Sequence, residues 1–323
     1  MIVIWGGTGF IGLHTAAELI EQGEQVVLTT YSRHRETPYL RAAVERGDAV
    51  LEPVDLRDAD SVMAVADKYR PTSMIDISGY PPKEMDPADE VRSRVANYVN
   101  VLEAARKLDV ERLTMTSSFD VYYGLPQTKL PYREDEPVPL QESEDHFIVQ
   151  SWAKKTLESI ASMYRRQQDL DIVTVRPAGA FGPMYRTFLN VPSRMVRAAV
   201  KGDEPTFPRE PDGRPRADFG YDQLYVKDIA RAIAGLHLKK DLAHPVYNIG
   251  SGEVLTNEQI LHAVQAAVPG FDYELAQTPA DEPPALKMVV DVTRLRDELG
   301  FEPRYSVTEA IGEYAEWLRE HEL

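Results

Sequence analysis

A glycine-rich run near the start of the chain carries the clearest chemical signal, and it reads Gly6, Gly7, Thr8, Gly9, Phe10, Ile11 and Gly12. Small residues in a turn let backbone N–H groups approach a pyrophosphate, and a following helix adds the favourable dipole of its N-terminus. The run comes directly after the apolar residues 2–5 and leads into a helical pattern over residues 13–22. A strand, a glycine-rich turn and a helix in this order predict a dinucleotide-binding site rather than an ordinary turn.

The elements that must position this turn follow an alternating pattern through the first half of the chain. Strands are predicted over residues 1–5, 25–30, 49–54, 73–77, 112–116 and 171–175, and helices over residues 13–22, 39–46, 59–69, 91–108 and 149–166. The strand segments are apolar with little polar alternation, which is typical of parallel strands buried on both faces. We therefore expect a doubly wound, Rossmann-type α/β sheet with its ligand site at the carboxyl ends of the strands.

The second half of the chain is less regular. Residues 125–146 contain four prolines and an acidic cluster, which predict a solvated loop that could also serve as a lid. Residues 201–222 are also irregular, and helices are predicted over residues 258–268, 293–299 and 308–321. We expect a Rossmann domain formed by residues 1–177, to which residues 222–250 return. Residues 178–221 and 251–323 would form a smaller α+β lobe that binds the substrate.

The bulk composition limits the functional classes. The chain has 323 residues, of which 43% are hydrophobic and 27% charged, as in ordinary globular proteins. With 52 acidic and 36 basic residues, its net charge of −16 disfavours nucleic acid and anionic membranes. The lack of cysteine excludes disulfides and thiol chemistry, and the seven histidines show no metal-ligand spacing. A cytoplasmic protein without a signal peptide, membrane span or metal is expected.

Several further motifs appear in a fixed order along the chain. They are Val54-Asp55-Leu56-Arg57-Asp58, Thr116-Ser117-Ser118-Phe119-Asp120-Val121-Tyr122, Arg176-Pro177 with Phe181-Gly182-Pro183, Tyr225-Val226-Lys227-Asp228, and Tyr247-Asn248-Ile249-Gly250-Ser251-Gly252. With the glycine run, they make the chain resemble the extended short-chain dehydrogenase/reductase family, in its epimerase/dehydratase branch, almost from end to end. This resemblance implies an NAD(P)-dependent oxidoreductase or epimerase that moves a hydride at a carbinol or carbonyl carbon of a small molecule.

The resemblance also assigns contacts to the cofactor. Asp55 would meet the adenine through its carboxylate and Leu56 through its backbone, although an Asp at this place could also cap a helix. Further contacts are implied for Ser78, Lys154 and Pro177.

The end of the second predicted strand bears on the choice between NAD and NADP. An acidic residue there binds the ribose hydroxyls of NAD, whereas basic residues accommodate the extra phosphate of NADP. This segment contains no acid, and Arg33 and Arg35 are suited to a phosphate, although a solvated basic turn would look the same. We therefore expect NADP, with NAD as the alternative, and contacts from Thr30, Ser32, Arg33 and Arg35.

The catalytic positions depart from the resembled family. Its usual arrangement is a Ser, and a Tyr four residues before a Lys; Ser118 and Lys154 match, but position 150 is Gln. A glutamine amide can orient a carbonyl group but cannot transfer a proton at neutral pH. Replacement proton donors could be Tyr80, Tyr122, Tyr123 or His146, each of which could equally serve packing or the surface. Alternatively, the reaction does not need this group, or the protein is a dinucleotide-binding sensor or scaffold without catalysis.

Substrate contacts are expected from residues after strand ends and in the second half: Tyr80, Phe119, Tyr123, Gly179, Tyr185, Arg186 and Tyr221. Members of the resembled family that act on nucleotide sugars often carry Asn and Arg where this chain has Gly179 and Tyr221. Arg186, Arg194, Arg214 or Arg216 could substitute for that Arg. The aromatic residues favour a more apolar or cyclic carbonyl compound. The resemblance also implies a possible homodimer through the helices over residues 91–108 and 149–166.

Overall fold

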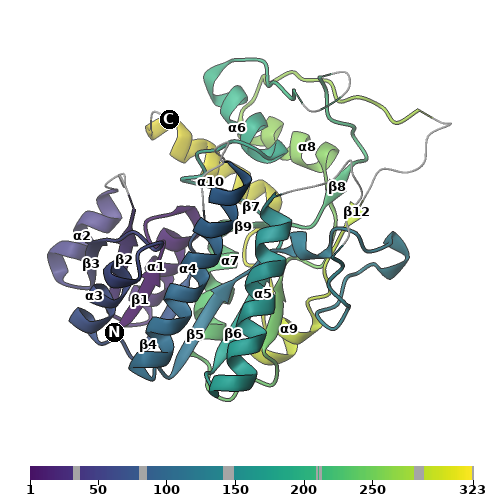
Figure 1. Ribbon diagram of the computed structural model, residues 1–323. Helices are drawn as coiled ribbons and strands as arrows, with labels where there is room; N and C mark the ends of the chain where they lie inside the picture. The colour runs from purple at the N-terminus through teal and green to yellow at the C-terminus, as the bar shows by residue number, and fades with distance from the viewer. Residues whose placement is uncertain are drawn as a thin grey trace. The chain divides into compact units, whose positions relative to one another are not determined.

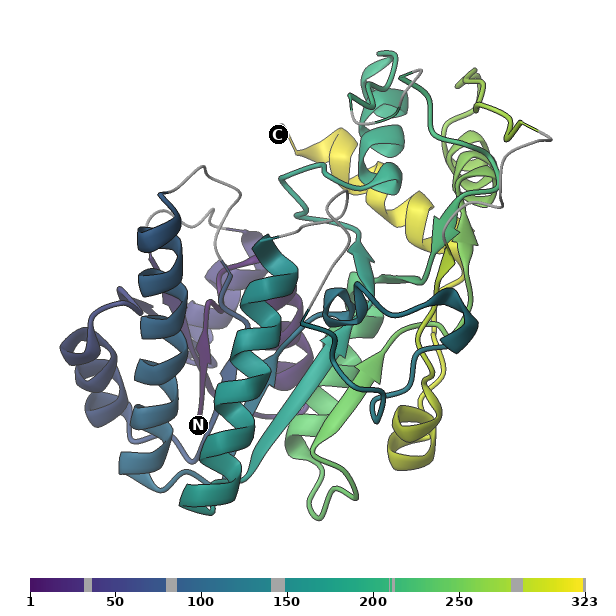
Figure 2. The same ribbon diagram turned by 45° about the vertical axis from the view of Figure 1, so that its right-hand side comes forward.

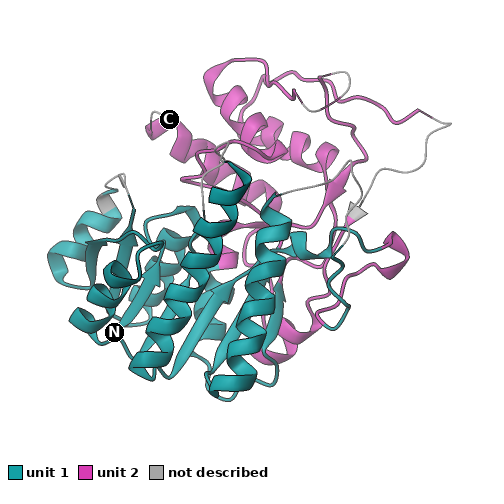
Figure 3. Cartoon of the chain, in the orientation of Figure 1, with its two compact units in different colours: residues 1–125, 135–177, 230–248 teal, residues 126–134, 178–229, 249–323 magenta. Residues whose placement is uncertain are grey.

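The computed structural model describes residues 1–31, 37–79, 86–140, 149–208, 210, 213–279 and 287–321. The chain forms two compact units, each built from three segments (Figure 3). The first unit comprises Met1–Leu125, Asp135–Pro177 and Ala230–Asn248, and the second comprises Pro126–Glu134, Ala178–Ile229 and Ile249–Leu323.

A seven-stranded sheet in the order β10-β6-β5-β4-β1-β2-β3 lies at the centre of the first unit (Figures 1 and 2). Its strands are β1 (Ile2–Trp5), β2 (Val26–Thr30), β3 (Ala49–Pro53), β4 (Ser73–Asp76), β5 (Arg112–Thr116), β6 (Ile172–Pro177) and β10 (Val246–Ile249). All pairs from β3 to β6 are parallel. The strand order reverses between β1 and β4, which is the switch point of a doubly wound sheet. The predicted Rossmann-type α/β class is confirmed.

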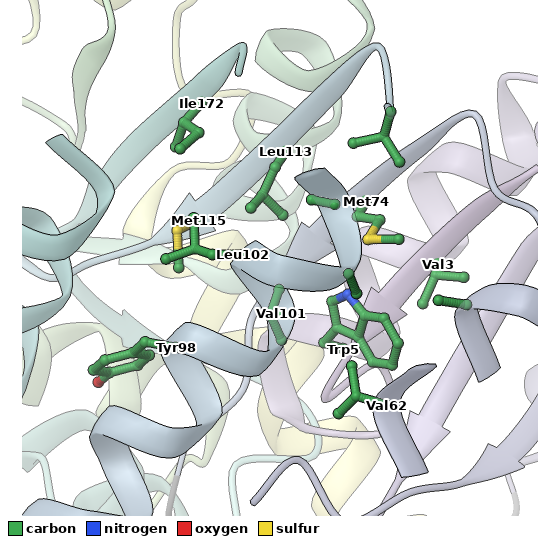
Figure 4. Packing of buried hydrophobic residues seen from close by; sticks show 14 of the residues in the cluster. Val3, Trp5, Val62, Met74, Tyr98, Val101, Leu102, Leu113, Met115 and Ile172 are labelled. Atoms are coloured by element: carbon green, nitrogen blue, oxygen red, sulfur yellow. The ribbon is translucent and has the colours of Figure 1, made fainter. Parts of the chain in front are cut away.

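One face of this sheet is covered by the helices α3 (Ala59–Tyr69), α4 (Pro87–Leu108) and α5 (Val149–Gln168). Alternate strand residues point to this face, so Val3 and Trp5 of β1 pack with Met74 of β4 against Val62 and Val101 of the helices (Figure 4). The Trp5 side chain is fully buried at the centre of this cluster. This core fixes the positions of the strand ends that carry the candidate site.

The helices α1 (Phe10–Glu21), α2 (Pro38–Arg46) and α7 (Val226–Leu238) complete the elements around the sheet. The His237 ring of α7 lies between two strand hydroxyls, with Nε2 2.8 Å from Ser73 Oγ and Nδ1 2.9 Å from Thr114 Oγ1. Ser73 and Thr114 alternate with Met74 and Leu113, which face the α3–α5 side, so α7 covers the opposite face.

The start of α4 shows how local sequence sets a helix boundary. The Asp86 side chain accepts a hydrogen bond from the backbone N–H of Ala88, and Pro87 occupies the first turn, where its missing N–H costs nothing. The helix therefore begins four residues before the predicted position 91. It ends at Asp109, which adopts a left-handed conformation with φ 53°.

The second unit contains small sheets and a helical cluster. Strand β7 (Gly179–Phe181) pairs in parallel with β9 (Gln223–Tyr225), and β8 (Gly220–Tyr221) lies between β11 (Leu255–Thr256) and β12 (Lys287–Met288). Helices α6 (Val191–Lys201), α8 (Asn257–Ala267) and α10 (Val307–Glu320) pack against one another, and α9 (Thr293–Leu299) follows β12. Single turns η1 (Phe119–Tyr122) and η2 (Gln127–Lys129) interrupt the loops after β5.

Candidate functional site

The glycine run forms the turn between β1 and α1, and its glycines are required by close contacts. Gly6 has φ +76°, and a Cβ there would lie 2.8 Å from the backbone Cα of Ser78, which follows β4. A Cβ on Gly12 would lie 2.6 Å from the carbonyl oxygen of Gly6. Larger residues at these two positions would push the turn away from the strand ends, so the turn stays tight at the switch point of the sheet.

The N-terminus of α1 fits an anionic ligand. The cap residue Gly9 has no side chain to accept hydrogen bonds from the first turn, and Gly9 itself is exposed. Helices normally satisfy these backbone N–H groups with a polar cap, with water or with a ligand. Because the helix dipole also favours negative charge here, the turn is suited to the pyrophosphate of a dinucleotide.

Asp55 lies after β3 and does not cap a helix. The cap of α3 is Asp58, whose carboxylate accepts a hydrogen bond from the N–H of Asp60 at 3.1 Å. Instead, Asp55 Oδ2 accepts a hydrogen bond from Arg57 Nη2 at 2.6 Å. The same Nη2 donates to Tyr31 Oη, also at 2.6 Å. The hydrogen bonds from Arg57 hold the pKa of Asp55 below its usual range. The alternative helix-capping interpretation of Asp55 is therefore wrong.

The other residues predicted to bind the cofactor differ in accessibility. The Leu56 carbonyl accepts a hydrogen bond from Asn100 Nδ2 at 2.8 Å, which fixes the loop after β3. Thr30 is buried and ends β2, and Pro177 is buried and ends β6. The backbone N–H of Ser78 donates to Asp76 Oδ1 at 2.9 Å. Ser32, Arg33 and Arg35 lie outside the described residues.

Lys154 is buried in α5 and reaches the carboxyl end of β5. Its Nζ donates a hydrogen bond to the carbonyl oxygen of Thr116 at 2.6 Å, and the residue is 5% exposed. Burial lowers the pKa of Lys154, while the charge of Asp76 opposes this effect. Asp76 ends β4 and is itself buried, which raises its pKa. Its Oδ2 has no hydrogen-bond partner among the described residues, so the region beside Lys154 contains unmet hydrogen-bonding capacity.

Gln150 lies in the first turn of α5, four residues before Lys154 and therefore on the same side of the helix. Two contacts tie this turn to the segment after β5. The hydroxyl of Ser151 donates to the carbonyl oxygen of Asp120 at 2.8 Å, and the N–H of Asp120 donates to Ser118 Oγ at 3.2 Å. The structure thus brings Ser118, Lys154 and the turn that carries Gln150 to one strand end.

A buried polar network lies behind this site. Ser117 donates to Glu158 Oε1 at 2.6 Å, and Arg176 pairs with both oxygens of Glu158. The Tyr122 hydroxyl accepts from Arg176 Nη1 at 2.7 Å and donates to Asn248 Oδ1 at 2.8 Å. Tyr122 is fully buried and its hydroxyl is part of this network. It is therefore not a proton donor for a substrate.

Of the remaining candidate residues near the site, the structure describes Tyr123 and Phe119. Tyr123 is half-buried, and its carbonyl oxygen accepts Lys155 Nζ at 3.0 Å, which separates the role of Lys155 from that of Lys154. Phe119 is buried in η1. Tyr80 and His146 lie outside the described residues. Described residues contain no group of three or more His, Asp or Glu side chains placed to hold a metal ion.

The predicted substrate residues of the second unit include one close pair. A Cβ on Gly179 would lie 2.5 Å from Cε2 of the Tyr221 ring, so Tyr221 occupies the space that a side chain at position 179 would need. Tyr185 is half-buried, which raises the pKa of its hydroxyl, and Arg186 is exposed. Gln223, the strand partner of Gly179, is a buried polar residue within β9.

These features define a dinucleotide-binding α/β protein of the doubly wound type. The family model described as "NAD dependent epimerase/dehydratase family" matches residues 2–250. The chain therefore belongs to the NAD-dependent epimerase/dehydratase family, and the predicted family and enzyme class are confirmed. Among the described residues, no helix has the length and apolar character needed to cross a membrane.

Three relatives are distant in sequence but cover nearly the whole chain. UDP-glucose 4-epimerase from Lactobacillus helveticus is 23% identical over 335 residues, covering 99% of this chain and 97% of that protein. A crystal structure of UDP-glucose 4-epimerase from Thermotoga maritima with UDP-glucose has TM-score 0.81 and 23% identity, covering 99% and 98% of the two chains. That of Thermus thermophilus UDP-glucose 4-epimerase with NAD has TM-score 0.77 and 24% identity, covering 98% of each chain.

Proposed function

We propose that this protein is an NADP(H)-dependent oxidoreductase or epimerase that transfers a hydride at a carbinol or carbonyl carbon of a small molecule. The observation that carries the proposal is Lys154, which is buried and hydrogen-bonded to the Thr116 carbonyl, with Ser118 after the same strand. Burying a lysine is costly unless its charge is paired or hydrogen-bonded, and Asp76 and the Thr116 carbonyl provide this for Lys154. A protein that only bound a dinucleotide would have no chemical reason to keep both groups.

The residues present fit a nicotinamide dinucleotide. Gly6, Gly9 and Gly12 would hold the pyrophosphate at the uncapped N-terminus of α1, and Asp55 and Leu56 would hold the adenine. Ser78 and Pro177, which follow or end strands of the sheet, would line the remaining contact. When bound, the cofactor supplies a hydride donor or acceptor.

At the reacting end, Lys154 would hold the nicotinamide ribose and Ser118 the substrate oxygen. Gln150 replaces the residue that would normally carry the proton, and its amide can only donate and accept hydrogen bonds. We therefore assign Gln150 to orienting the substrate carbonyl. The proton would pass through the Ser118 hydroxyl or through another group of the site, for which Tyr80, Tyr123 and His146 stay candidates.

The preference for NADP(H) rests on the segment after β2, where residues 30–35 contain no acid but include Arg33 and Arg35. The solved relative from Thermus thermophilus contains NAD, which makes NAD the alternative. Fluorescence titration with NADPH and NADH tests the preference. We expect tighter binding of NADPH, and weaker binding in an Arg33→Ala, Arg35→Ala double variant. Tighter binding of NADH would contradict the proposal.

A second candidate function is favoured by Gln150 itself: a sensor or scaffold that binds the dinucleotide without turnover. Turnover assays add UDP-glucose or cyclohexanone to the wild type, Lys154→Ala and Gln150→Tyr. Cofactor absorbance follows a net oxidation or reduction, and NMR of the sugar follows an epimerisation, which leaves the cofactor unchanged. For an enzyme, wild-type turnover should disappear in Lys154→Ala even at a cofactor concentration that saturates the variant. If the wild type binds NADPH but turnover appears only in Gln150→Tyr, the protein is a sensor or scaffold.

We also propose that the second unit binds the substrate and that the protein forms a homodimer through α4 and α5. These helices pack side by side, and Val91 and Met163 are 44% and 47% exposed on them. Sedimentation should give twice the chain mass, and a monomeric mass would refute the dimer.

The lack of cysteine and the charge of −16 support a cytoplasmic location, which cell fractionation would test.

A further inference from the structure

Asp76 is a buried carboxylate at the carboxyl end of β4, and no role was predicted for it. The residue is 2% exposed, and its Oδ1 accepts a hydrogen bond from the backbone N–H of Ser78 at 2.9 Å. Its Oδ2 has no hydrogen-bond partner among the described residues. A buried carboxylate is costly unless an opposite charge or hydrogen bonds compensate it, so Asp76 needs a compensating group nearby.

The strand register places Asp76 next to the strand end that Lys154 reaches. Asp76 pairs with Met115 of β5, and the next residue of that strand, Thr116, provides the carbonyl that accepts Lys154 Nζ at 2.6 Å. Asp76 points to the same face of the sheet as Met74 and Met115, which is the face that α5 covers. Because neighbouring strands lie about 4.8 Å apart, the carboxylate and the ammonium group lie near each other.

The charge of Lys154 decides how many groups its side chain can bind. An ammonium group has three N–H donors, whereas a neutral amine has two. The Thr116 carbonyl takes one donor, so only the charged form keeps two donors for neighbouring hydroxyl groups of a ligand.

Each member of the pair favours the charged form of the other. Burial lowers the pKa of Lys154, and the charge of Asp76 opposes this effect. Burial also raises the pKa of Asp76, and the hydrogen bond from Ser78 and the charge of Lys154 oppose that effect. Gln150, one turn before Lys154 on α5, is uncharged and cannot replace the carboxylate.

Three further charged groups affect the pKa of Lys154: Arg94 of α4, which lowers it, and Asp120 and Glu158, which raise it. Glu158 already forms a two-bonded ion pair with Arg176. Asp120 is half-buried, so water screens its charge more than that of Asp76. Asp76 is therefore the main counter-charge of Lys154.

We infer that Asp76 is a positioning residue that keeps the buried Lys154 side chain charged at the end of β5, with two donors directed to a ligand. The statement that this ligand is the nicotinamide ribose of a cofactor rests on the proposed function. The link between Asp76 and the charge of Lys154 does not, because it can be measured in the ligand-free protein.

The test is an NMR titration of ligand-free protein labelled with ¹³C at lysine Cε, from pH 6 to 10. The Lys154 signal is the one that disappears in Lys154→Met. The test variant is Asp76→Asn, which keeps the size of the side chain but removes its charge. Asp222→Asn is the matched control, because Asp222 is a buried carboxylate of the second unit.

We expect Lys154 to be charged at pH 7 in the wild type. Its pKa should fall by about 1–3 in Asp76→Asn, as for the loss of a nearby opposite charge, and should be unchanged in Asp222→Asn. The inference is overturned if Lys154 is neutral at pH 7 in the wild type, or if it titrates alike in the wild type and in Asp76→Asn.

Melting temperatures provide a second test, which does not need Asp76→Asn to fold well. The double variant Asp76→Asn, Lys154→Met removes both charges and should melt at a higher temperature than Asp76→Asn. The gap should narrow from pH 7 to 9, because the folded single variant then loses the Lys154 proton while its unfolded chain keeps it. A double variant that melts no higher, or a gap that does not change with pH, would overturn the inference.

NADPH titration separates this inference from the proposed function. The affinity of Asp76→Asn for NADPH should be lower at pH 9 than at pH 7, with a smaller change in the wild type. If no protein binds NADPH while the titration of Lys154 still depends on Asp76, only the proposed function falls. If the wild type binds NADPH but Lys154 titrates independently of Asp76, only this inference falls.

Discussion

Arg176 and Glu158 form a two-bonded ion pair behind the candidate site, with Nε 2.8 Å from Oε1 and Nη2 2.6 Å from Oε2. The side chains are 4% and 12% exposed, so both charges are almost removed from water. Ser117 and Tyr122 add further hydrogen bonds to the pair. The pair joins β6 to α5 and so fixes the helix that carries Lys154.

Removing one partner of this pair should strongly destabilise the first unit. Glu158→Gln or Arg176→Met leaves a buried charge without its counter-ion, which costs about 3–5 kcal/mol. Urea unfolding followed by circular dichroism measures the loss. Arg46→Met is the control, because the Arg46–Asp48 pair is exposed at 55% and 36% and should contribute no more than about 1 kcal/mol. Equal effects of the buried and exposed variants would contradict this prediction.

Gly12→Ala should abolish tight NADPH binding and lower stability. The new Cβ would lie 2.6 Å from the Gly6 carbonyl oxygen, so the turn that holds the pyrophosphate must move. Gly312→Ala in α10 is the matched control, because a Cβ there meets nothing within 4 Å. That control should bind NADPH normally and gain about 0.5–1 kcal/mol, as alanine favours helices over glycine. Normal NADPH affinity in Gly12→Ala would sink the assignment of the turn.

His237 should make the protein sensitive to acid. Burial, and then the charge of Arg112, lower the pKa of His237 from 6.5 to about 3. Between pH 6.5 and 3, His237 is therefore protonated in the unfolded chain but neutral in the folded chain. The free energy of unfolding falls as the pH drops through this range. The slope is about 1.4 kcal/mol per pH unit. In His237→Gln the fall in unfolding free energy from pH 6 to 4 should be smaller; an unchanged fall would disprove the prediction.

Asp222 should make the folded protein less stable as the pH rises, which is the opposite of the effect of His237. Burial raises the pKa of Asp222 from 3.8 to about 6, although hydrogen bonds from Ser251 and Gly252 oppose this effect. The folded chain keeps the proton longer than the unfolded chain, so its stabilising contribution is present below pH 3.8 and is lost by pH 6. The loss is about 3 kcal/mol in total. Relative to the wild type, Asp222→Asn should become more stable as the pH rises from 4 to 6, which urea titrations at each pH would measure.

The strands of the first unit could be predicted because they are buried on both faces. A continuous apolar run such as residues 2–5 identifies a strand without any knowledge of its neighbours. Helix α6 was missed although Asn190 caps it, Pro192 lies in its first turn and Gly202 ends it. Its flanking irregular segments obscured these signals, since each is also typical of loops.

The site was predictable in its residue types but not in its partners. Ser118 and Lys154 could be found by their spacing and by resemblance, whereas the hydrogen bond from Lys154 to the Thr116 carbonyl depends on how α5 crosses β5. Tyr122 was a candidate by its position in the sequence, but its hydroxyl is hydrogen-bonded to Arg176 and Asn248, which lie 54 and 126 residues away.

The route of the chain through its two units also bears on how the protein is made. Strand β10, which forms an edge of the seven-stranded sheet next to β6, ends only at Ile249. A ribosome must therefore synthesise Ala178–Ile229, which belongs to the second unit, before it can finish the sheet of the first. During translation β6 therefore remains an unpaired edge strand, and unpaired edge strands can form hydrogen bonds with other chains. Neither unit exists as one uninterrupted stretch of the gene, so a functional half cannot be obtained by simple truncation.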